Sequence, residues 1–84
     1  MSKIYDEPIA VQMKAWNEPV RFTWRGHRYS VKECISTWRE RHSWWRRRGE
    51  VNKMFVRVET DRGGMYDLCF DISERCWRLY RVWD

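Results

Sequence analysis

The stretch that decides the fold is VRFTWRGHRYSV, residues 20–31. Its apolar residues alternate with polar ones on both sides of a glycine: Val20, Phe22, Trp24, Tyr29 and Val31. A two-residue turn at Gly26-His27 places Trp24 opposite Tyr29, with glycine at the first loop position as a type II′ turn prefers. Phe22 then lies opposite Val31, so all the apolar side chains share one face. The stretch therefore predicts a β-hairpin.

Two more hairpins are expected downstream. In MFVRVETDRGGMYDLCFDI, residues 54–72, a three-residue loop at Asp61-Arg62-Gly63 supplies the positive φ that a G1 bulge needs. This register forms three apolar pairs: Val58 with Tyr66, Val56 with Leu68 and Met54 with Phe70. A further turn near Ser73-Glu74 sets Phe70 against Trp77 and Leu68 against Leu79. Strand-like spacing then continues to Trp83.

The segment PIAVQMKAW, residues 8–16, also alternates, with Ile9, Val11 and Met13 on one face. Hairpin signals at short intervals indicate an all-β fold, an antiparallel meander of about six strands. We expect such strands to curl into a small barrel or a strongly bent sheet. Residues 1–7 are expected to be a flexible N-terminus, and residues 8–84 a single β-rich domain.

One stretch does not fit this pattern. In residues 30–49, apolar residues fall at Val31, Cys34 or Ile35, Trp38, His42 and Trp45, which is helical spacing. The β-branched residues and the missing cap signature favour an irregular strand with a bulge. The alternative is an α+β fold with one short helix around residues 32–46.

Length and composition restrict the class of protein. The 84 residues include seven Trp, four Tyr and three Phe, enough large side chains to fill the core of one small domain. No apolar run is long enough to cross a membrane, and the start MSKIYDEP lacks the apolar region of a secretory signal. The cysteines, Cys34, Cys69 and Cys76, are odd in number, which favours free thiols in a reducing compartment. We therefore expect a cytoplasmic protein without a membrane partner.

Catalytic motifs are missing from the sequence. It holds no G-x-S-x-G, Walker loop or H-E-x-x-H, and its two histidines, His27 and His42, lie in a predicted turn and in a basic run. Its Cys and His residues do not have the spacing of a zinc knuckle. The sequence therefore predicts a protein that is not an enzyme and holds no metal or cofactor.

Positive charge is concentrated in the middle of the chain. Residues 21–48 carry nine Lys or Arg against Glu33 and Glu40, a net of +7, whereas the whole chain has a net charge of +5. Arginines interleaved with tryptophans are typical of surfaces that neutralise phosphates and stack on bases. The candidate nucleic-acid-binding residues are Arg25, Arg28, Arg39, Arg41, Trp44, Trp45, Arg46, Arg47 and Arg48.

The tryptophans of this run have different expected roles. Trp38 is expected in the core. Trp44 and Trp45 are adjacent, so in an extended segment they point in opposite directions and one of them is more exposed. The candidate stacking platform is therefore Trp44 and Trp45 beside Arg46–Arg48.

The order of these elements resembles that of a known protein family. FTWRGHRYSVKECISTWRE, then WW, FVRVET, YDLCFD and WRLYRVWD resemble an uncharacterised family of short bacterial proteins, a domain of unknown function. The resemblance covers about residues 8–84. A related pattern occurs in the tail of proteins similar to Y-family DNA polymerases, the kind associated with mutagenesis. The resemblance implies an accessory role near DNA repair or replication, and it transfers no functional residue.

Two functions remain open on these grounds. The first is a non-catalytic accessory module that binds single-stranded DNA or RNA through the basic-aromatic surface. The second is a protein–protein interaction or scaffold module whose partner is a DNA-repair or replication protein, or a second copy in a weak homodimer.

Overall fold

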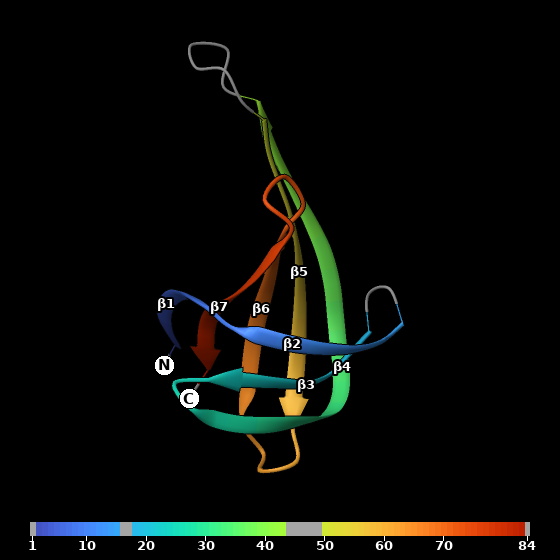
Figure 1. Cartoon of the computed structure of the whole chain (residues 1–84), viewed down its shortest axis with the longest axis vertical. Helices are drawn as coiled ribbons and strands as arrows, with labels where there is room; N and C mark the ends of the chain where they lie inside the picture. Colours follow the sequence, from blue (N-terminus) through green and yellow to red (C-terminus); the bar gives the residue numbers. More distant parts are fainter. Residues whose placement is uncertain (1, 16–17, 44–49, 84) are drawn as a thin grey trace.

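The computed structural model describes residues 2–15, 18–43 and 50–83, and the side chains of all of these except 41–43, 50 and 51. These residues form strands and turns and contain no helix (Figure 1). The strands are β1 (Ser2–Pro8), β2 (Ala10–Ala15), β3 (Glu18–Trp24), β4 (His27–Ser43), β5 (Glu50–Thr60), β6 (Met65–Asp71) and β7 (Cys76–Trp83).

All the strands of the described residues belong to one antiparallel sheet with the order β1-β7-β6-β5-β4-β3-β2. The sheet is open, with β1 and β2 as its edges, although only Ile9 separates these two strands in the sequence. The prediction of an all-β fold is confirmed, in the form of a strongly bent sheet and not a closed barrel.

The sheet bends into two layers that face each other. The small layer consists of β2, β3 and residues 27–30 of β4, and it lies across the large layer, which consists of the rest of β4 with β5, β6, β7 and β1 (Figure 1). β4 joins the layers and carries two register shifts, between Val31 and Glu33 and between Cys34 and Ser36. Bulges of this kind bend and twist a strand, which lets β4 pass from one layer to the other.

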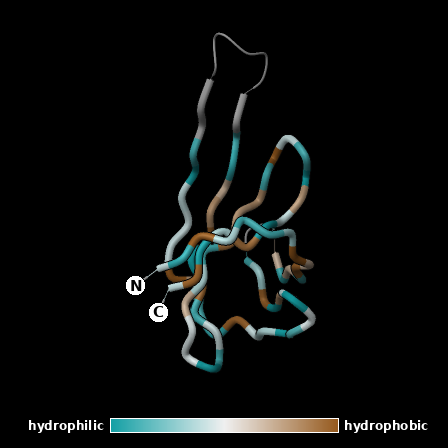
Figure 2. Tube along the Cα trace, turned by 90° about the vertical axis from the view of Figure 1, so that its left-hand side faces the viewer, coloured by the Kyte–Doolittle hydropathy of each residue, from teal (hydrophilic) through white to brown (hydrophobic). Residues whose placement is uncertain are grey.

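The core lies between the layers. Phe22 of the small layer packs against five buried residues of the large layer, and hydrophobic segments gather near the middle of the trace (Figure 2). These five are Met54, Val56, Val58, Leu68 and Leu79. Tyr29 stacks on Phe22 at a centroid distance of 4.9 Å, and Tyr66 meets the same ring edge-on at 5.5 Å. The alternation of β3, β5, β6 and β7 therefore directs the apolar side chains of one face of each strand into a shared core.

Two of the three predicted hairpins have the predicted register. The β5–β6 turn pairs Val58 with Tyr66, and Gly63 adopts a φ of 89° in the loop. The β6–β7 turn pairs Phe70 with Trp77. Asp71 stabilises this turn because its Oδ1 atom accepts hydrogen bonds from the backbone N–H groups of Ser73 and Glu74.

The β3–β4 hairpin forms, but its predicted register is wrong because the turn lies one residue earlier than predicted. The loop is Arg25-Gly26, and Trp24 lies opposite His27 instead of Tyr29. Both loop residues have positive φ, 53° and 76°, as in a type I′ turn, whose twist matches that of the flanking strands. Moving the turn by one residue shifts the pairing by two, so the apolar residues still share a face.

Residues 2–7 differ from the flexible terminus expected there. They lie in β1, which pairs with the last strand from Ser2 opposite Trp83 to Pro8 opposite Arg78. Asp6, with a φ of 52°, lies within a register shift of this pairing, and its Oδ1 atom accepts a hydrogen bond of 2.7 Å from Arg78 Nε. The two ends of the described chain therefore lie side by side.

Residues 32–43 form a strand and not the alternative helix. They continue β4 as an irregular strand with bulges, and the alternative helix is wrong for this range. Trp38 is not in the core between the layers. It lies opposite Phe55 on the outer face of the large layer and stacks on that ring at 5.4 Å. The physical reason is strand alternation, because the two bulges together restore the original parity and Trp38 lies an odd number of residues after the inward-facing Val31.

Candidate nucleic-acid interface

The structure separates the predicted site residues. Arg25 lies in the β3–β4 turn and Arg28 follows it in the small layer, whereas Arg39 lies opposite Met54 in the large layer. The backbone of Arg41 belongs to β4, but its side chain is outside the described part. Trp44, Trp45, Arg46, Arg47 and Arg48 lie outside the described residues. Among the predicted residues whose side chains are described, Arg25 and Arg28 therefore lie in the β3–β4 hairpin and Arg39 in the large layer, and the predicted common surface stays a prediction.

Arg25 is engaged in an ion pair. Its Nη2 atom donates to Glu7 Oε2 at 2.7 Å and its Nε atom donates to Glu7 Oε1 at 3.0 Å. Trp24 Nε1 donates to Glu7 Oε1 at 2.9 Å. The Arg25 guanidinium also lies 4.9 Å from the centroid of the Trp24 ring and 5.0 Å from that of Tyr5. This guanidinium therefore ties the end of β1 to the β3–β4 hairpin.

The same contacts stabilise the ionised form of Glu7. Hydrogen bonds from Arg25 and then from Trp24 lower the pKa of Glu7 from 4.5 to about 2. The carboxylate stays charged at neutral pH and compensates the charge of Arg25. Arg25 is thus already paired with Glu7 although 55% of its side chain is exposed, and its contact with a phosphate stays a prediction.

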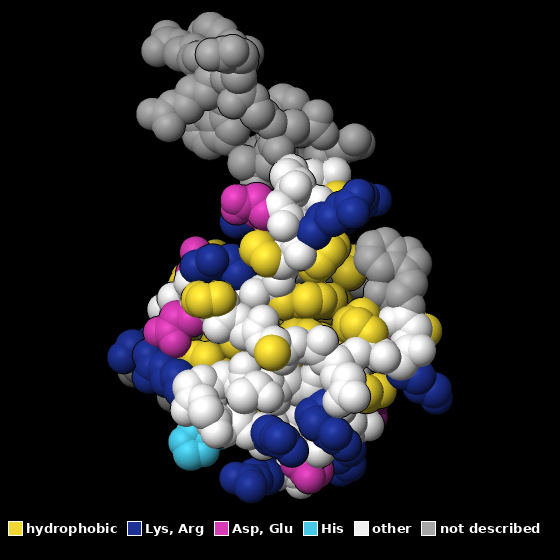
Figure 3. Space-filling view, in the orientation of Figure 1, with side chains coloured by type: hydrophobic (Ala, Val, Ile, Leu, Met, Phe, Trp, Pro, Cys, Tyr) yellow, Lys and Arg dark blue, Asp and Glu magenta, His cyan; other side chains and the backbone are white. Residues whose placement is uncertain are grey.

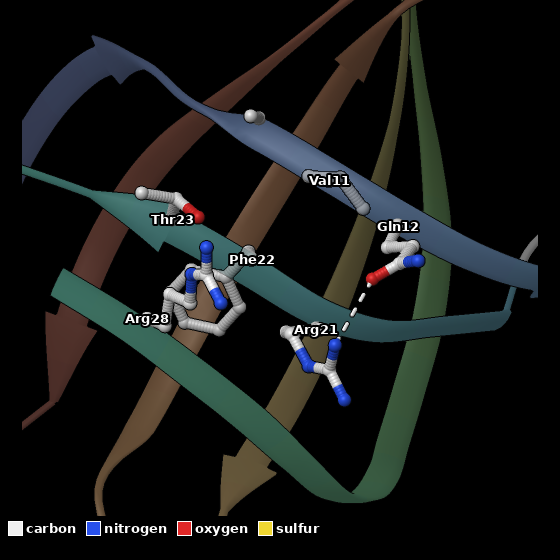
Figure 4. Close-up of a pocket in the computed structure, with 7 residues that line it drawn as sticks. Val11, Gln12, Arg21, Phe22, Thr23 and Arg28 are labelled. Atoms are coloured by element: carbon white, nitrogen blue, oxygen red, sulfur yellow. Dashed lines mark hydrogen bonds between the residues drawn. The ribbon is translucent and has the colours of Figure 1, made fainter. Parts of the chain in front are cut away.

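Two other arginines lie on the outer face of the small layer. The register across β2, β3 and β4 forms two rows there, Ala10–Thr23–Arg28 and Gln12–Arg21–Ser30. Arg21 Nη1 donates to Gln12 Oε1 at 3.3 Å (Figure 4). Within the described part of the chain, neither Arg21 nor Arg28 forms an ion pair.

These rows border an open hollow of about 350 Å³. It is lined by Ala10, Val11, Gln12, Arg21, Phe22, Thr23 and Arg28. In Figure 4 both guanidinium groups lie on the viewer's side of the strands, away from the core. The lining contains two cations and no carboxylate, so the hollow can accept an anionic group from solvent.

The surroundings strengthen this positive field. In β2, β3 and residues 27–30 of β4, the bases Lys14, Arg21 and Arg28 stand against one acid, Glu18. On the face of the molecule in Figure 3, Lys and Arg side chains gather in the lower half, and a hydrophobic band lies above them. The described part of the small layer therefore carries a net positive charge.

A comparison with known families identifies the chain. The family model described as a domain of unknown function, DUF6504, matches residues 1–84. The chain belongs to this family. No curated protein and no solved structure matches it significantly. The resemblance to a domain of unknown function is confirmed, and it extends over the whole chain instead of residues 8–84.

Two thiols of this DUF6504 chain, those of Cys34 and Cys69, have raised pKa values. Burial raises the pKa of Cys69 to about 11, and burial also raises that of Cys34. Both thiols are therefore protonated at neutral pH and poorly nucleophilic. Among the residues that the structure describes, no group of three or more His, Cys, Asp or Glu side chains is arranged to hold a metal ion. No helix in the described ranges could span a membrane.

Sequence reasoning missed Arg21 and included Arg28. The alternation in residues 20–31 carries the signal that locates both, because residues between apolar positions point to the opposite face. Thr23 and Arg28 are cross-strand partners in the observed hairpin, and Arg21 lies opposite Ser30. The dense Arg/Trp run at residues 38–48 drew the prediction away from this pair.

Proposed function

We propose that this DUF6504 chain is a non-catalytic accessory module that binds single-stranded nucleic acid through the outer face of the small layer. The observation that carries the proposal is the hollow between Arg21 and Arg28, whose guanidinium groups lack a carboxylate partner among the described residues. A phosphodiester backbone provides repeated anionic oxygens to which guanidinium groups donate.

The composition of the hollow favours binding that depends on charge more than on base identity. Phe22 is 1% exposed, so its ring is not available as a platform for a base. Thr23 and Gln12 add hydrogen-bonding groups, but the cations dominate the lining. We therefore expect modest affinity, steep salt dependence and little sequence preference.

The test is fluorescence anisotropy of a labelled oligo-dT 20-mer, titrated with the full chain at several salt concentrations. The double variant Arg21→Glu/Arg28→Glu is expected to bind at least tenfold more weakly at low salt. Each phosphate contact with a single strand contributes about 0.7 to the slope of log K against log salt, so removing two contacts should reduce the slope by about 1.4.

The matched control is Lys3→Glu/Arg75→Glu, which changes the net charge equally at two exposed positions away from the hollow. If the control weakens binding as much as the double reversal does, only net charge matters and the proposed interface is wrong. Absence of binding by the natural chain at low salt would also refute the proposal.

The predicted contribution of Trp44, Trp45 and Arg46–Arg48 stays a prediction. The triple variant Arg46→Glu/Arg47→Glu/Arg48→Glu measures it in the same assay. If this variant alone abolishes binding and the Arg21/Arg28 reversal has no effect, the interface includes the sequence segment between β4 and β5 and not the hollow.

The biological setting that we propose is DNA repair or replication, in the cytoplasm. Its support is the resemblance of the W-R-G-x-R-Y and W-R-L-Y-R-V elements to the tail of proteins similar to Y-family polymerases. An accessory module beside a polymerase would hold the single-stranded template, which agrees with the proposed charge-driven binding.

The second candidate function is protein–protein interaction. It is favoured by exposed apolar side chains, Ile4 at 52%, Ile35 at 43% and Val20 at 36%, and by the free edges β1 and β2. Exposed apolar groups and unpaired strand edges are common contact points for other chains. Sedimentation of the chain at high concentration tests self-association, and a purely monomeric species would exclude the homodimer.

A further inference from the structure

Six side chains on the outer face of the large layer form a closed ring of contacts. They are Trp38, Phe55, Tyr80, Arg81, Trp83 and Arg57. The face that carries them points away from the small layer, and therefore away from the viewer in Figure 1.

The contacts alternate between aromatic and cationic groups around much of the ring. The Arg57 guanidinium lies 5.1 Å from the Trp38 ring centroid and 4.7 Å from that of Trp83. Arg81 continues the series, at 5.0 Å from Trp83 and 5.8 Å from Tyr80. Phe55 closes the ring, since it lies 5.2 Å from Tyr80 and stacks on Trp38. Cation–π contacts on both sides hold each guanidinium in place.

The strand register explains why these residues meet. Trp38 is the cross-strand partner of Phe55, and Arg81 is that of Asp67. The pairing of β6 with β7 shifts between Asp67 and Leu68, so Tyr80 is the additional residue of a bulge. A bulge residue can point out of the normal alternation, which places Tyr80 against Phe55 on the outer face.

The two guanidinium groups of the ring differ in charge compensation. Arg57 makes two hydrogen bonds to the buried carboxylate of Asp67, at 2.8 and 3.2 Å. Arg81 forms no ion pair with a described residue, and its Nε atom is buried without an acceptor. The indole Nε1 atom of Trp83 is buried without an acceptor as well. The two buried donors are closed to solvent, so the feature open to a partner is the charge of Arg81, which has no ion-pair partner among the described residues and which an added carboxylate would stabilise.

The edge of this face has the opposite sign. On the same side as the ring, the register places Glu33 opposite Glu59 and Glu40 opposite Lys53. Asp71 lies opposite Lys53 on the other neighbouring strand. A nucleic-acid backbone would be repelled by this acidic border, whereas a protein segment can place a single carboxylate at the centre.

An apolar contact point lies next to Arg81. Ile4 of β1 is its cross-strand partner, and 52% of Ile4 is exposed. Directly opposed side chains on one face of a sheet are about 4.5–5.5 Å apart at their Cβ atoms. Half-buried aromatic and arginine side chains thus adjoin an exposed aliphatic one, and aromatic and arginine side chains are enriched at the centre of protein interfaces.

We propose that this face docks a partner protein through a segment that places an Asp or Glu carboxylate on Arg81 and a neighbouring apolar side chain on Ile4 and Trp83. The proposal rests on the second candidate function and not on nucleic-acid binding. Either one can fail alone, because the hollow at Arg21 and Arg28 and the ring at Arg81 lie on outer faces of different layers.

The test is selection of peptides from a random 12-residue phage-display library against the immobilised full chain. The enriched peptides are expected to share an acidic residue adjacent to an aromatic or aliphatic one. Synthetic peptides with this consensus should bind the Arg81→Gln variant at least tenfold more weakly. Replacing the acidic residue of the peptide with its amide should produce a similar loss on the natural chain and little further loss on the variant.

Two more variants distinguish a loss of peptide binding from a loss of folding. Ile4→Asp changes an exposed side chain, so it should weaken the peptides at least tenfold while thermal unfolding stays unchanged. Arg75→Gln removes an exposed arginine in the β6–β7 turn and should leave binding unchanged.

Several results would overturn the docking proposal. These are failure to enrich any sequence, a consensus without an acidic residue, and binding that is insensitive to both Arg81→Gln and Ile4→Asp. Oligonucleotide binding that is lost in Arg81→Gln would also overturn it, since this face would then bind nucleic acid.

Discussion

Glu7 shows how a single side chain connects distant segments of this fold. It accepts hydrogen bonds from Trp24 and Arg25, which lie 17 and 18 residues away in the sequence. Because these contacts exist only in the folded state, they favour the ionised carboxylate there. The same contacts compensate the charge of Arg25. Ion pairs of this kind therefore determine which arginines have a charge that is available to a ligand.

The lowered pKa of Glu7 predicts acid sensitivity. A carboxyl group whose pKa is depressed from 4.5 to about 2 stabilises the fold fully above pH 4.5 and loses this contribution as the pH falls toward 2. We expect Glu7→Gln to lower the urea midpoint at pH 7 and to approach the natural chain near pH 2. A stability difference that stays constant between pH 5 and pH 2 would contradict this role of Glu7.

The strands show which parts of the fold were predictable. Turn residues fixed the register of the β5–β6 and β6–β7 hairpins, because glycine and Asx geometry restrict the loop length. At the β3–β4 turn, Gly26 suits either of two loop positions, and the sequence does not choose between them. In β4, the two bulges space the inward positions as Val31, Cys34 and Thr37, and this period of three resembles the spacing of a helix.

Gly63 provides a prediction at the same scale. Its φ of 89° strains any residue with a Cβ atom, although no atom lies within 4 Å of where that Cβ would be. We expect Gly63→Ala to destabilise the chain by about 1–2 kcal/mol through backbone strain alone. Gly63→Asn should cost less, because asparagine tolerates positive φ. Urea denaturation measures both, and equal losses for the two variants would argue against strain as the cause.

At the scale of the whole molecule, the sequence does not predict which distant strands pair with each other. The pairing of β1 with β7 joins residues at opposite ends of the chain, and no local pattern in residues 1–7 indicates it. Only part of the candidate site could be predicted from the sequence. The alternation around residues 20–31 locates Arg21 and Arg28, but which residues of β2 lie beside them depends on how the sheet bends.

The bent sheet also separates two outer faces with different charge. The small layer carries uncompensated cations, whereas the ring on the large layer is bordered by carboxylates. A module with this arrangement can hold a nucleic-acid strand on one face and a protein on the other. The sequence run at residues 38–48, read as one basic-aromatic motif, contains Trp38, which belongs to the second face.

The most direct test of the central claim is a ¹H–¹⁵N NMR titration of the full chain with oligo-dT at low salt. The account predicts shifts concentrated at the backbone amides of Gln12, Arg21, Thr23 and Arg28, which reverse when salt is added. Shifts centred on the indole N–H signals of Trp38 and Trp83, or no shifts at all, would contradict it.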